Sequence, residues 1–159
     1  MDPISAAMAE PTRAAWTAAL HFEQNAGQAS AGEFLGRGPD YLFAIDGAQF
    51  RMRLTDLKGR LTAVDVQLRG SRATTGKLAE PTGAASNYFS GNDPNKWTGS
   101  VPHYRRLRYS NVYDGIDVEY YSAEGRLEYD FIVAPGGDPR QIGLRFRHAR
   151  RLEIDASGD

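Results

Sequence analysis

The sequence predicts a mainly β protein: an antiparallel β-sandwich, with a barrel-like form as the alternative, preceded by a short N-terminal helix. Several short segments alternate apolar and polar side chains with period two, which is typical of half-buried strands. Clusters of glycine, proline, asparagine and aspartate separate those segments, as they do in sandwiches and barrels. The chain has 159 residues, a length that corresponds to one domain.

Residues 1–21 are interpreted as a tail that contains the one expected helix, over residues 12–20. Thr12 would cap this helix, and Trp16 and Leu20 would share a face because they lie four positions apart. A single β domain is expected over residues 22–159.

The expected strands are 41–46, 50–54, 64–68, 101–109, 116–121, 127–133 and 142–147, with a further strand over 152–155. Turns are expected at Lys58-Gly59, at 90–97 and at 134–139, where turn-forming residues gather. Residues 70–86 are rich in glycine, serine, threonine and alanine and are interpreted as a long loop.

The chain closes on Ser157-Gly158-Asp159, a turn-forming sequence with no strand after it. We therefore expect a domain that is truncated at its C-terminal edge and that contacts neighbouring domains of a longer chain. Because an unpaired edge strand recruits other strands, self-association through that edge is also expected.

The composition argues against several classes of partner and ligand. A formal net charge of −1 provides no overall field for nucleic acid, and no apolar run approaches the ~18 residues of a membrane span. The chain has no cysteine, which excludes disulfides and cysteine-ligated zinc. His21, His103 and His148 lack the spacing of a zinc site and are interpreted as surface or hydrogen-bonded histidines. No cofactor is expected from these patterns, apart from a calcium ion considered below.

Two predicted strands near residue 120 carry four acidic side chains on one face. If Ser122–Gly125 turns the chain, the apolar faces coincide when Tyr120 pairs with Leu127, or in a register shifted by two. The first register places like charges opposite each other across the strands, which is destabilising unless something neutralises them. The acidic residues are Asp117, Glu119, Glu128 and Asp130.

Three neutralising arrangements are open. The favoured one is pairing with arginines of nearby strands, and the candidates are Arg106, Arg108, Arg145 and Arg147. The second is a Ca²⁺ ion bound by the four carboxylates, since Ca²⁺ takes several oxygen ligands. The third is a carboxylate dyad of a glycan-active hydrolase, for which Glu119 and Glu128 are the catalytic candidates.

Exposed aromatic rings stack on sugars and anchor protein interfaces. Trp97, which follows a turn, and Tyr121, on the polar face of its strand, are the two aromatic residues expected to be exposed. They are the candidate ligand-binding residues of a carbohydrate-binding module.

Long ordered motifs carry a resemblance to a known family. They are HFEQNAGQ (21–28), FLGRGPDY (34–41), NYFSGNDPNKW (87–97), VPHYRRLRYSNVYDGIDVEYY (101–121) and LEYDFIVAPGGDPRQIGLRF (127–146). Together they resemble the N-terminal domain of bacterial SBBP-repeat proteins, large secreted or cell-surface proteins in which this domain precedes β-propeller-type repeats. The resemblance implies an extracellular or cell-surface location and a β fold, and it implies no catalytic residues.

The function expected from the sequence is that of a non-enzymatic structural or recognition module of a secreted or cell-surface bacterial protein. The partners expected are neighbouring domains of the chain and a glycan or protein ligand. The two alternatives are a carbohydrate-binding module and a glycan-active hydrolase that uses paired carboxylates.

Overall fold

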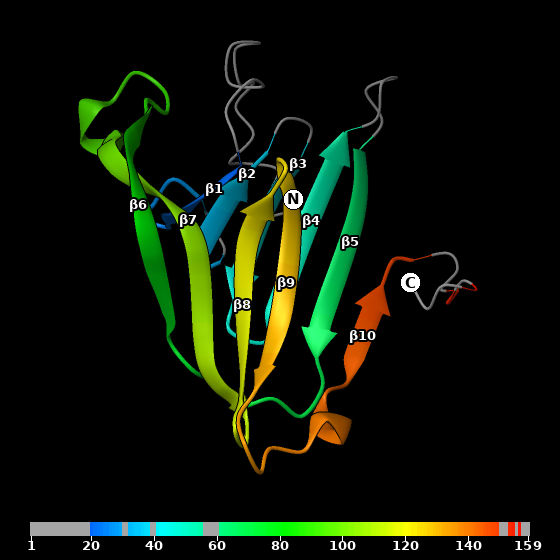
Figure 1. The fold of residues 1–159 in the computed structure, drawn as a ribbon. Helices are drawn as coiled ribbons and strands as arrows, with labels where there is room; N and C mark the ends of the chain where they lie inside the picture. The colour runs from blue at the N-terminus through cyan, green and yellow to red at the C-terminus, as the bar shows by residue number, and fades with distance from the viewer. Residues whose placement is uncertain are drawn as a thin grey trace.

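A computed structural model describes residues 20–29, 32–38, 41–55, 61–149, 153–154 and 156 (Figure 1). The Lys58-Gly59 turn and all of the expected helix over 12–20 except Leu20 lie outside the described residues. Of the expected last strand over 152–155, Glu153 and Ile154 are described, and they are not in a strand. The structure is mainly antiparallel β, so the predicted fold class is confirmed. Its strands form one strongly curled sheet, a half-barrel, which is nearer to the barrel-like alternative than to two separate sheets.

The sheet has ten strands in the order β10-β5-β4-β3-β2-β1-β7-β8-β9, and β6 pairs with β7 outside this path. Their bounds are β1 His21–Gln24, β2 Phe34–Arg37, β3 Tyr41–Asp46, β4 Gln49–Thr55, β5 Leu61–Leu68, β6 Gly76–Tyr88, β7 Thr98–Tyr113, β8 Ile116–Ala123, β9 Arg126–Val133 and β10 Leu144–Arg147. Two short 3₁₀ helices, Pro94–Lys96 and Pro139–Gln141, lie in the connections before β7 and before β10. Within the part of the chain that the structure describes, no helix is long and apolar enough to cross a membrane.

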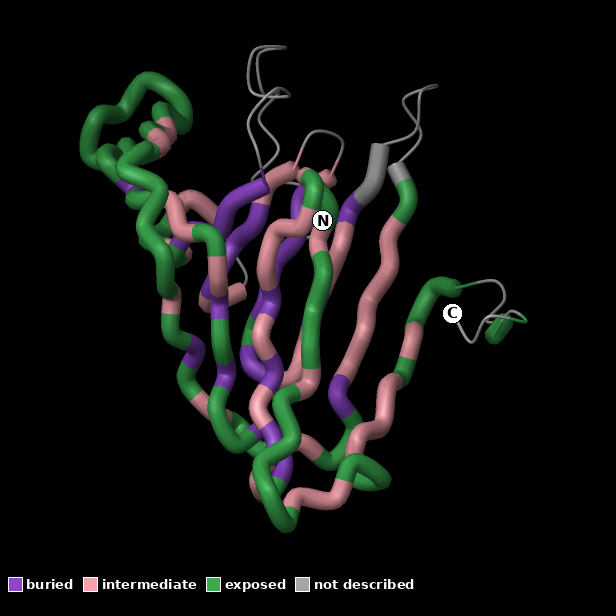
Figure 2. The backbone as a smooth tube through the Cα atoms, in the orientation of Figure 1, coloured by how far each residue is buried: buried purple, intermediate pink, exposed green. Residues whose placement is uncertain are grey.

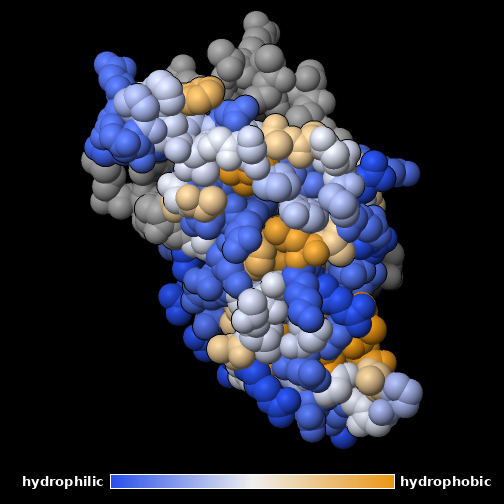
Figure 3. Space-filling view, turned by 90° about the vertical axis from the view of Figure 1, so that its left-hand side faces the viewer, coloured by the Kyte–Doolittle hydropathy of each residue, from blue (hydrophilic) through white to orange (hydrophobic). Residues whose placement is uncertain are grey.

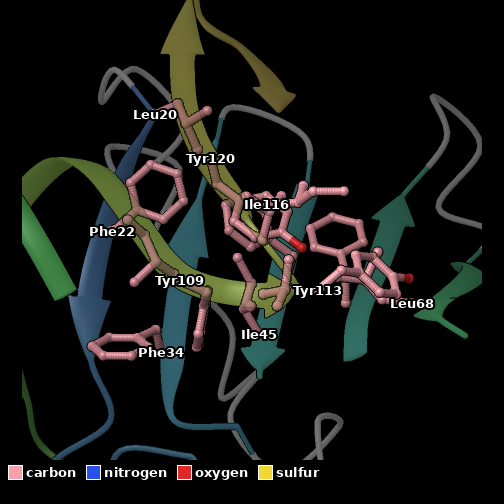
Figure 4. Close-up of a cluster of buried hydrophobic side chains, with 14 residues drawn as sticks. Leu20, Phe22, Phe34, Ile45, Leu68, Tyr109, Tyr113, Ile116 and Tyr120 are labelled. Carbon is pink, nitrogen blue, oxygen red and sulfur yellow. The ribbon is translucent and has the colours of Figure 1, made fainter. Parts of the chain in front are cut away.

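The hydrophobic core fills the concave side of the curled sheet. Figure 4 shows side chains from strands distant in sequence, among them Phe22 of β1, Phe34 of β2 and Tyr109 of β7, gathered into one cluster. Phe22, Phe43 and Tyr109 are each 0 % exposed. Figure 2 shows that buried positions follow the inner strands, while β6 and the hairpin tips are exposed. The alternation of buried and exposed residues in β8 follows the predicted period of two.

The strand β6 corrects the sequence analysis, which interpreted residues 70–86 as a loop. Gly76–Tyr88 pairs with β7 over most of its length and is exposed at most positions. Because an edge strand of this kind buries little apolar surface, its residues need no apolar–polar alternation, and its backbone hydrogen bonds leave no mark on the sequence. The strands β1 and β2 were likewise not predicted, since each has only four residues.

The β8–β9 hairpin adopts the register shifted by two, with Tyr120 paired with Tyr129. The expected four-residue turn is wrong, because the strands extend to a two-residue turn of Glu124 and Gly125 with φ of 51° and 77°. Two positive φ values are the requirement of a type I′ turn, whose twist matches that of the strands. The predicted oppositions of Glu119 with Glu128 and of Asp117 with Asp130 are therefore wrong. The structure pairs Glu119 with Asp130, Asp117 with Ile132 and Tyr121 with Glu128.

Candidate functional site

One candidate site is a groove along the open side of the half-barrel. It has a volume of about 310 Å³ and runs between β8 and β9 on one side and β3, β4, β5 and β10 on the other. Its lining is almost entirely apolar and includes Phe50, Met52, Val66, Tyr120, Tyr129 and Phe146. Arg126 is the charged side chain among the described lining residues. Burial raises the pKa of Tyr120 above its usual range, so that this phenol stays neutral.

This groove continues the hydrophobic core outward. Half-buried side chains such as Met52, Leu127 and Leu144 pack against the buried cluster and also line the groove. The strand β9 ends the sheet on one side of the groove, and its Tyr129 and Val133 are 43 % and 39 % exposed. An apolar surface of this kind, beside a strand edge that is unpaired among the described residues, is suited to a ligand that brings both apolar side chains and backbone hydrogen bonds.

The carboxylate face, the outer surface formed by Asp117, Glu119, Glu128 and Asp130, lies on the opposite side of the same hairpin. Arg106 Nη1 donates to Glu119 at 2.6 Å, and Arg108 donates to Asp117 Oδ2 at 2.7 and 3.0 Å. Burial acts to raise the pKa of Asp117, but the amide of Asn111 and the guanidinium of Arg108 outweigh it and lower the pKa. Arginines of β7 thus neutralise the two carboxylates of β8.

The other residues of this face have different partners. The Tyr121 hydroxyl donates to Glu128 at 3.3 Å and also contacts Asp130. Arg145 and Arg147 lie on β10, at the far end of the strand order from β9. Glu119, the candidate acid of a glycan hydrolase, lies against a guanidinium group, whereas a glycosidase acid usually occupies an apolar pocket. The hydrolase and calcium hypotheses remain predictions.

The predicted aromatic pair is divided between two places. Trp97, 42 % exposed, lies at the tip of the β6–β7 hairpin, where it packs edge-on against Phe89 with ring centroids 5.1 Å apart. Tyr121 lies on β8 beside Arg106, whose guanidinium is 5.3 Å from its ring centroid. About 26 Å of strand separates Thr98 from Arg106 along β7. The two residues therefore cannot form one sugar-stacking platform, and Figure 3 shows that the side carrying β6 and β7 is mostly hydrophilic.

A buried polar cluster is the feature that sequence reasoning missed. The pairing of Phe22 with Tyr104 brings His21 and Glu23, on the face of β1 opposite to Phe22, next to His103 of β7. Glu23 is 0 % exposed, and its Oε1 lies 2.9 Å from His21 Nε2 and 3.3 Å from His103 Nε2. The two imidazole rings stack with centroids 3.7 Å apart and an interplanar angle of 14°.

Further polar groups surround Glu23. Its Oε2 accepts a hydrogen bond from the Tyr88 hydroxyl and another, 3.4 Å long, from Gln28 Nε2. Burial acts to raise the pKa of Glu23, but the hydrogen bonds from His21 and Tyr88 outweigh it, so the pKa is lowered. Burial also raises the pKa of Tyr88 to about 12 and, with the proximity of His21, lowers the pKa of His103.

A serine, a histidine and a glutamate meet in this cluster without forming a catalytic triad. Ser86 Oγ lies 2.6 Å from His103 Nε2, the same nitrogen that faces Glu23. In a triad the histidine uses one ring nitrogen for the nucleophile and the other for the carboxylate. Here Ser86 and Glu23 both face Nε2 of His103. The histidine therefore cannot accept the serine proton at one nitrogen while the carboxylate orients it through the other.

A protein family matches the chain over most of its length. The family described as "Domain of unknown function (DUF7948)" matches residues 22–159. The chain belongs to the DUF7948 family. No curated protein and no solved structure matches it. In this DUF7948 domain the matched region begins at Phe22, on the strand that carries His21 and Glu23, and covers every residue of the described sheet except His21.

One short signal pointed to the polar cluster of the DUF7948 domain. His21 and Glu23 are two positions apart and therefore share a face of a strand. His103 is 80 positions further along the chain than Glu23, and no spacing rule connects residues that far apart. Only the pairing of β1 with β7 brings them together.

Proposed function

We propose that this DUF7948 domain is a non-enzymatic recognition module whose groove takes up an extended polypeptide strand with apolar side chains. The observation that carries the proposal is the apolar groove beside the outer edge of β9, with which no described strand pairs. Uptake of a strand at an exposed sheet edge is a common mode of peptide recognition, in which backbone hydrogen bonds provide affinity and pockets select side chains.

The hairpin geometry indicates which backbone groups face the incoming strand. In a two-residue hairpin the residues next to the turn, Ala123 and Arg126, form a hydrogen-bonded pair, and such pairs alternate along the strands. The amides of Leu127, Tyr129 and Phe131 therefore point away from β8, toward the free edge. The side chains of Leu127 and Tyr129 line the groove. A bound strand would thus complete the backbone pairing of β9 and cover apolar side chains at the same position.

Binding of a short synthetic peptide tests this proposal. The probe is an eight-residue peptide of alternating valine and threonine with lysine at both ends, and the readout is the shift of backbone amide NMR signals. We expect the largest shifts in β9, and a loss of binding when alternate peptide amides are N-methylated. Phe146→Lys should weaken binding at least tenfold, while Arg145→Lys, its outward-facing neighbour on β10, should leave binding unchanged.

Other outcomes refute the proposal in distinct ways. Equal binding of the N-methylated peptide would indicate a pocket for small apolar molecules instead of a strand site. No binding at millimolar peptide would exclude this recognition mode. A dimer in light scattering, abolished by Phe146→Lys, would show that a second copy of the chain occupies the groove.

The wider setting is part of the same proposal. The resemblance to SBBP-repeat proteins supports a secreted or cell-surface location and attachment to neighbouring β modules. In that setting, a strand from an adjacent module of the same chain would be a ligand of the expected chemistry. Pull-down between this domain and the adjacent modules, with the Phe146→Lys variant as control, tests that part.

A second candidate is carbohydrate binding, which the exposed Phe89–Trp97 pair favours. Phe89 is 68 % exposed and Trp97 42 %, so two aromatic rings in contact with each other are open to solvent. Sugar binding at this hairpin tip predicts signal on a glycan array that Trp97→Ala removes and Tyr121→Ala leaves intact. No signal for the unsubstituted domain would rule it out.

A further inference from the structure

The buried polar cluster lies away from the groove of the proposed function. Phe22 points into the concave core, so His21 and Glu23, its neighbours on β1, point to the convex side of the sheet. His103 is partly exposed there, with 13 % of its side-chain surface accessible, so small ions can reach it from solvent. The cluster therefore takes no part in strand binding by the groove.

We propose that His21, Glu23 and His103 bind one divalent transition-metal ion of the Zn²⁺ class. One ring nitrogen of each histidine and a Glu23 carboxylate oxygen lie within 4.8 Å of one another. Ligands about 2.0–2.1 Å from a tetrahedral Zn²⁺ are about 3.3 Å from each other. The separations from Glu23 Oε1 are 2.9 Å to His21 and 3.3 Å to His103, so these two distances are already close to that value.

The surrounding groups leave the right atoms available. Tyr88 and Gln28 hydrogen-bond to Oε2 of Glu23 and fix the carboxylate, while Oε1 faces the two imidazoles. Such outer partners commonly orient metal-binding side chains. Ser86 Oγ, 2.6 Å from His103 Nε2, lies where a hydroxyl or a water would complete four-coordination. The stacked rings of His21 and His103 must tilt away from parallel to direct both nitrogens at one ion. Bonds from these nitrogens to the ion would then replace their present contacts with Glu23.

The charges and donor types select the class of ion. One carboxylate oxygen and two imidazole nitrogens form a donor set that suits Zn²⁺ and its neighbours better than Ca²⁺ or Mg²⁺. Arg37 contacts Tyr88 through its Nε at 3.0 Å, and its positive charge opposes any cation held by charge alone. Binding therefore depends on directional bonds from the imidazole nitrogens, and hard cations such as Ca²⁺ and Mg²⁺ should not bind at this site.

Titration of the full, untagged chain with Co²⁺ and Zn²⁺ tests the inference. We expect one equivalent of Co²⁺ to produce the visible absorption of a four-coordinate site, and Zn²⁺ to displace it. His103→Gln should weaken binding at least tenfold, whereas His148→Gln should not change it. His148 is the matched control because its Nε2 faces Asp65, 3.7 Å away, on another part of the sheet.

Two results of this titration would overturn the inference. Absence of a Co²⁺ spectrum at millimolar metal with the unsubstituted protein, or the same affinity in His103→Gln, would exclude the site. Circular dichroism of His103→Gln separates lost binding from lost folding, and a Glu23→Asp variant, which keeps the carboxylate, provides a second test. It should retain binding with an altered Co²⁺ spectrum, and an unaltered spectrum would also exclude the site. Peptide binding in the groove should be unaffected by metal.

Discussion

Replacing Gly36 of β2 with alanine should strongly destabilise the fold. A Cβ atom at this position would lie 1.8 Å from the ring of Phe43, which is 0 % exposed, whereas carbon atoms pack at about 3.5–4.0 Å. The ring is confined by Phe22 and Phe50, with centroids 5.6 and 5.3 Å away, and cannot shift by the required distance. Overpacking of a core costs about 1–3 kcal/mol, and this close approach places Gly36→Ala near 3 kcal/mol.

The assay is chemical and thermal unfolding followed by circular dichroism. A loss of about 3 kcal/mol lowers the Tm of a domain of this size by about 10 °C. Gly99→Ala is the matched control, because Gly99 also lies in a strand and its nearest neighbour would be the Asn87 side chain at 3.2 Å. The double variant Gly36→Ala/Phe43→Leu should recover part of the loss, as coupled neighbours do. A free energy of unfolding within 0.5 kcal/mol of the unsubstituted domain for Gly36→Ala would refute the steric argument.

Three further predictions concern the β8–β9 hairpin. Asp117→Asn should cost about 0.5–1 kcal/mol at pH 7, because it weakens the contacts with Arg108 and with the Asn111 amide. Since the pKa of Asp117 is lowered by folding, its contribution is complete above the unfolded pKa of about 3.9 and is lost as the pH falls through the folded pKa. The stability difference between the two proteins should therefore vanish in acid, and a difference that persists at pH 2 would contradict this. Glu124→Asn should raise the free energy of unfolding by about 0.5 kcal/mol, because asparagine tolerates the positive φ of 51° better than glutamate. Urea denaturation measures this free energy, and Gly125→Ala, at a φ of 77°, should lower it. Adding Ca²⁺ should leave the Tm unchanged, since arginines already neutralise two residues of the carboxylate face; a saturable rise would indicate a calcium site.

The convex surface shows why local patterns predicted part of the candidate sites. Alternation placed Asp117 and Glu119 together on the outer face of one strand, and Arg106 and Arg108 together on another. The structure pairs these two strands, and the expected neutralisation by arginine is present for both carboxylates. Arg145 and Arg147 share the same pattern, yet they belong to a strand at the other end of the sheet.

The register of the β8–β9 hairpin shows the limit of the same reasoning. Side chains at period two are compatible with any even shift, so the apolar pattern left two registers open. The choice between them rests on the turn, where Glu124 adopts a positive φ and the chain reverses in two residues, so that Ser122 and Ala123 join β8. Glutamate gives little indication of such a turn, so the sequence favours a turn over all four residues Ser122–Gly125.

The sequence by itself determined that the chain is a mainly antiparallel β protein, because side-chain alternation and turn residues are local properties. Tertiary structure alone decided that the strands curl into one half-barrel, that an apolar groove stays open beside β9, and that His21, Glu23 and His103 meet on the convex face. The physical reason is the same in each case. Those features depend on which strands pair across long stretches of chain. Strand pairing is made by backbone hydrogen bonds, and every residue offers the same backbone groups apart from the missing N–H of proline.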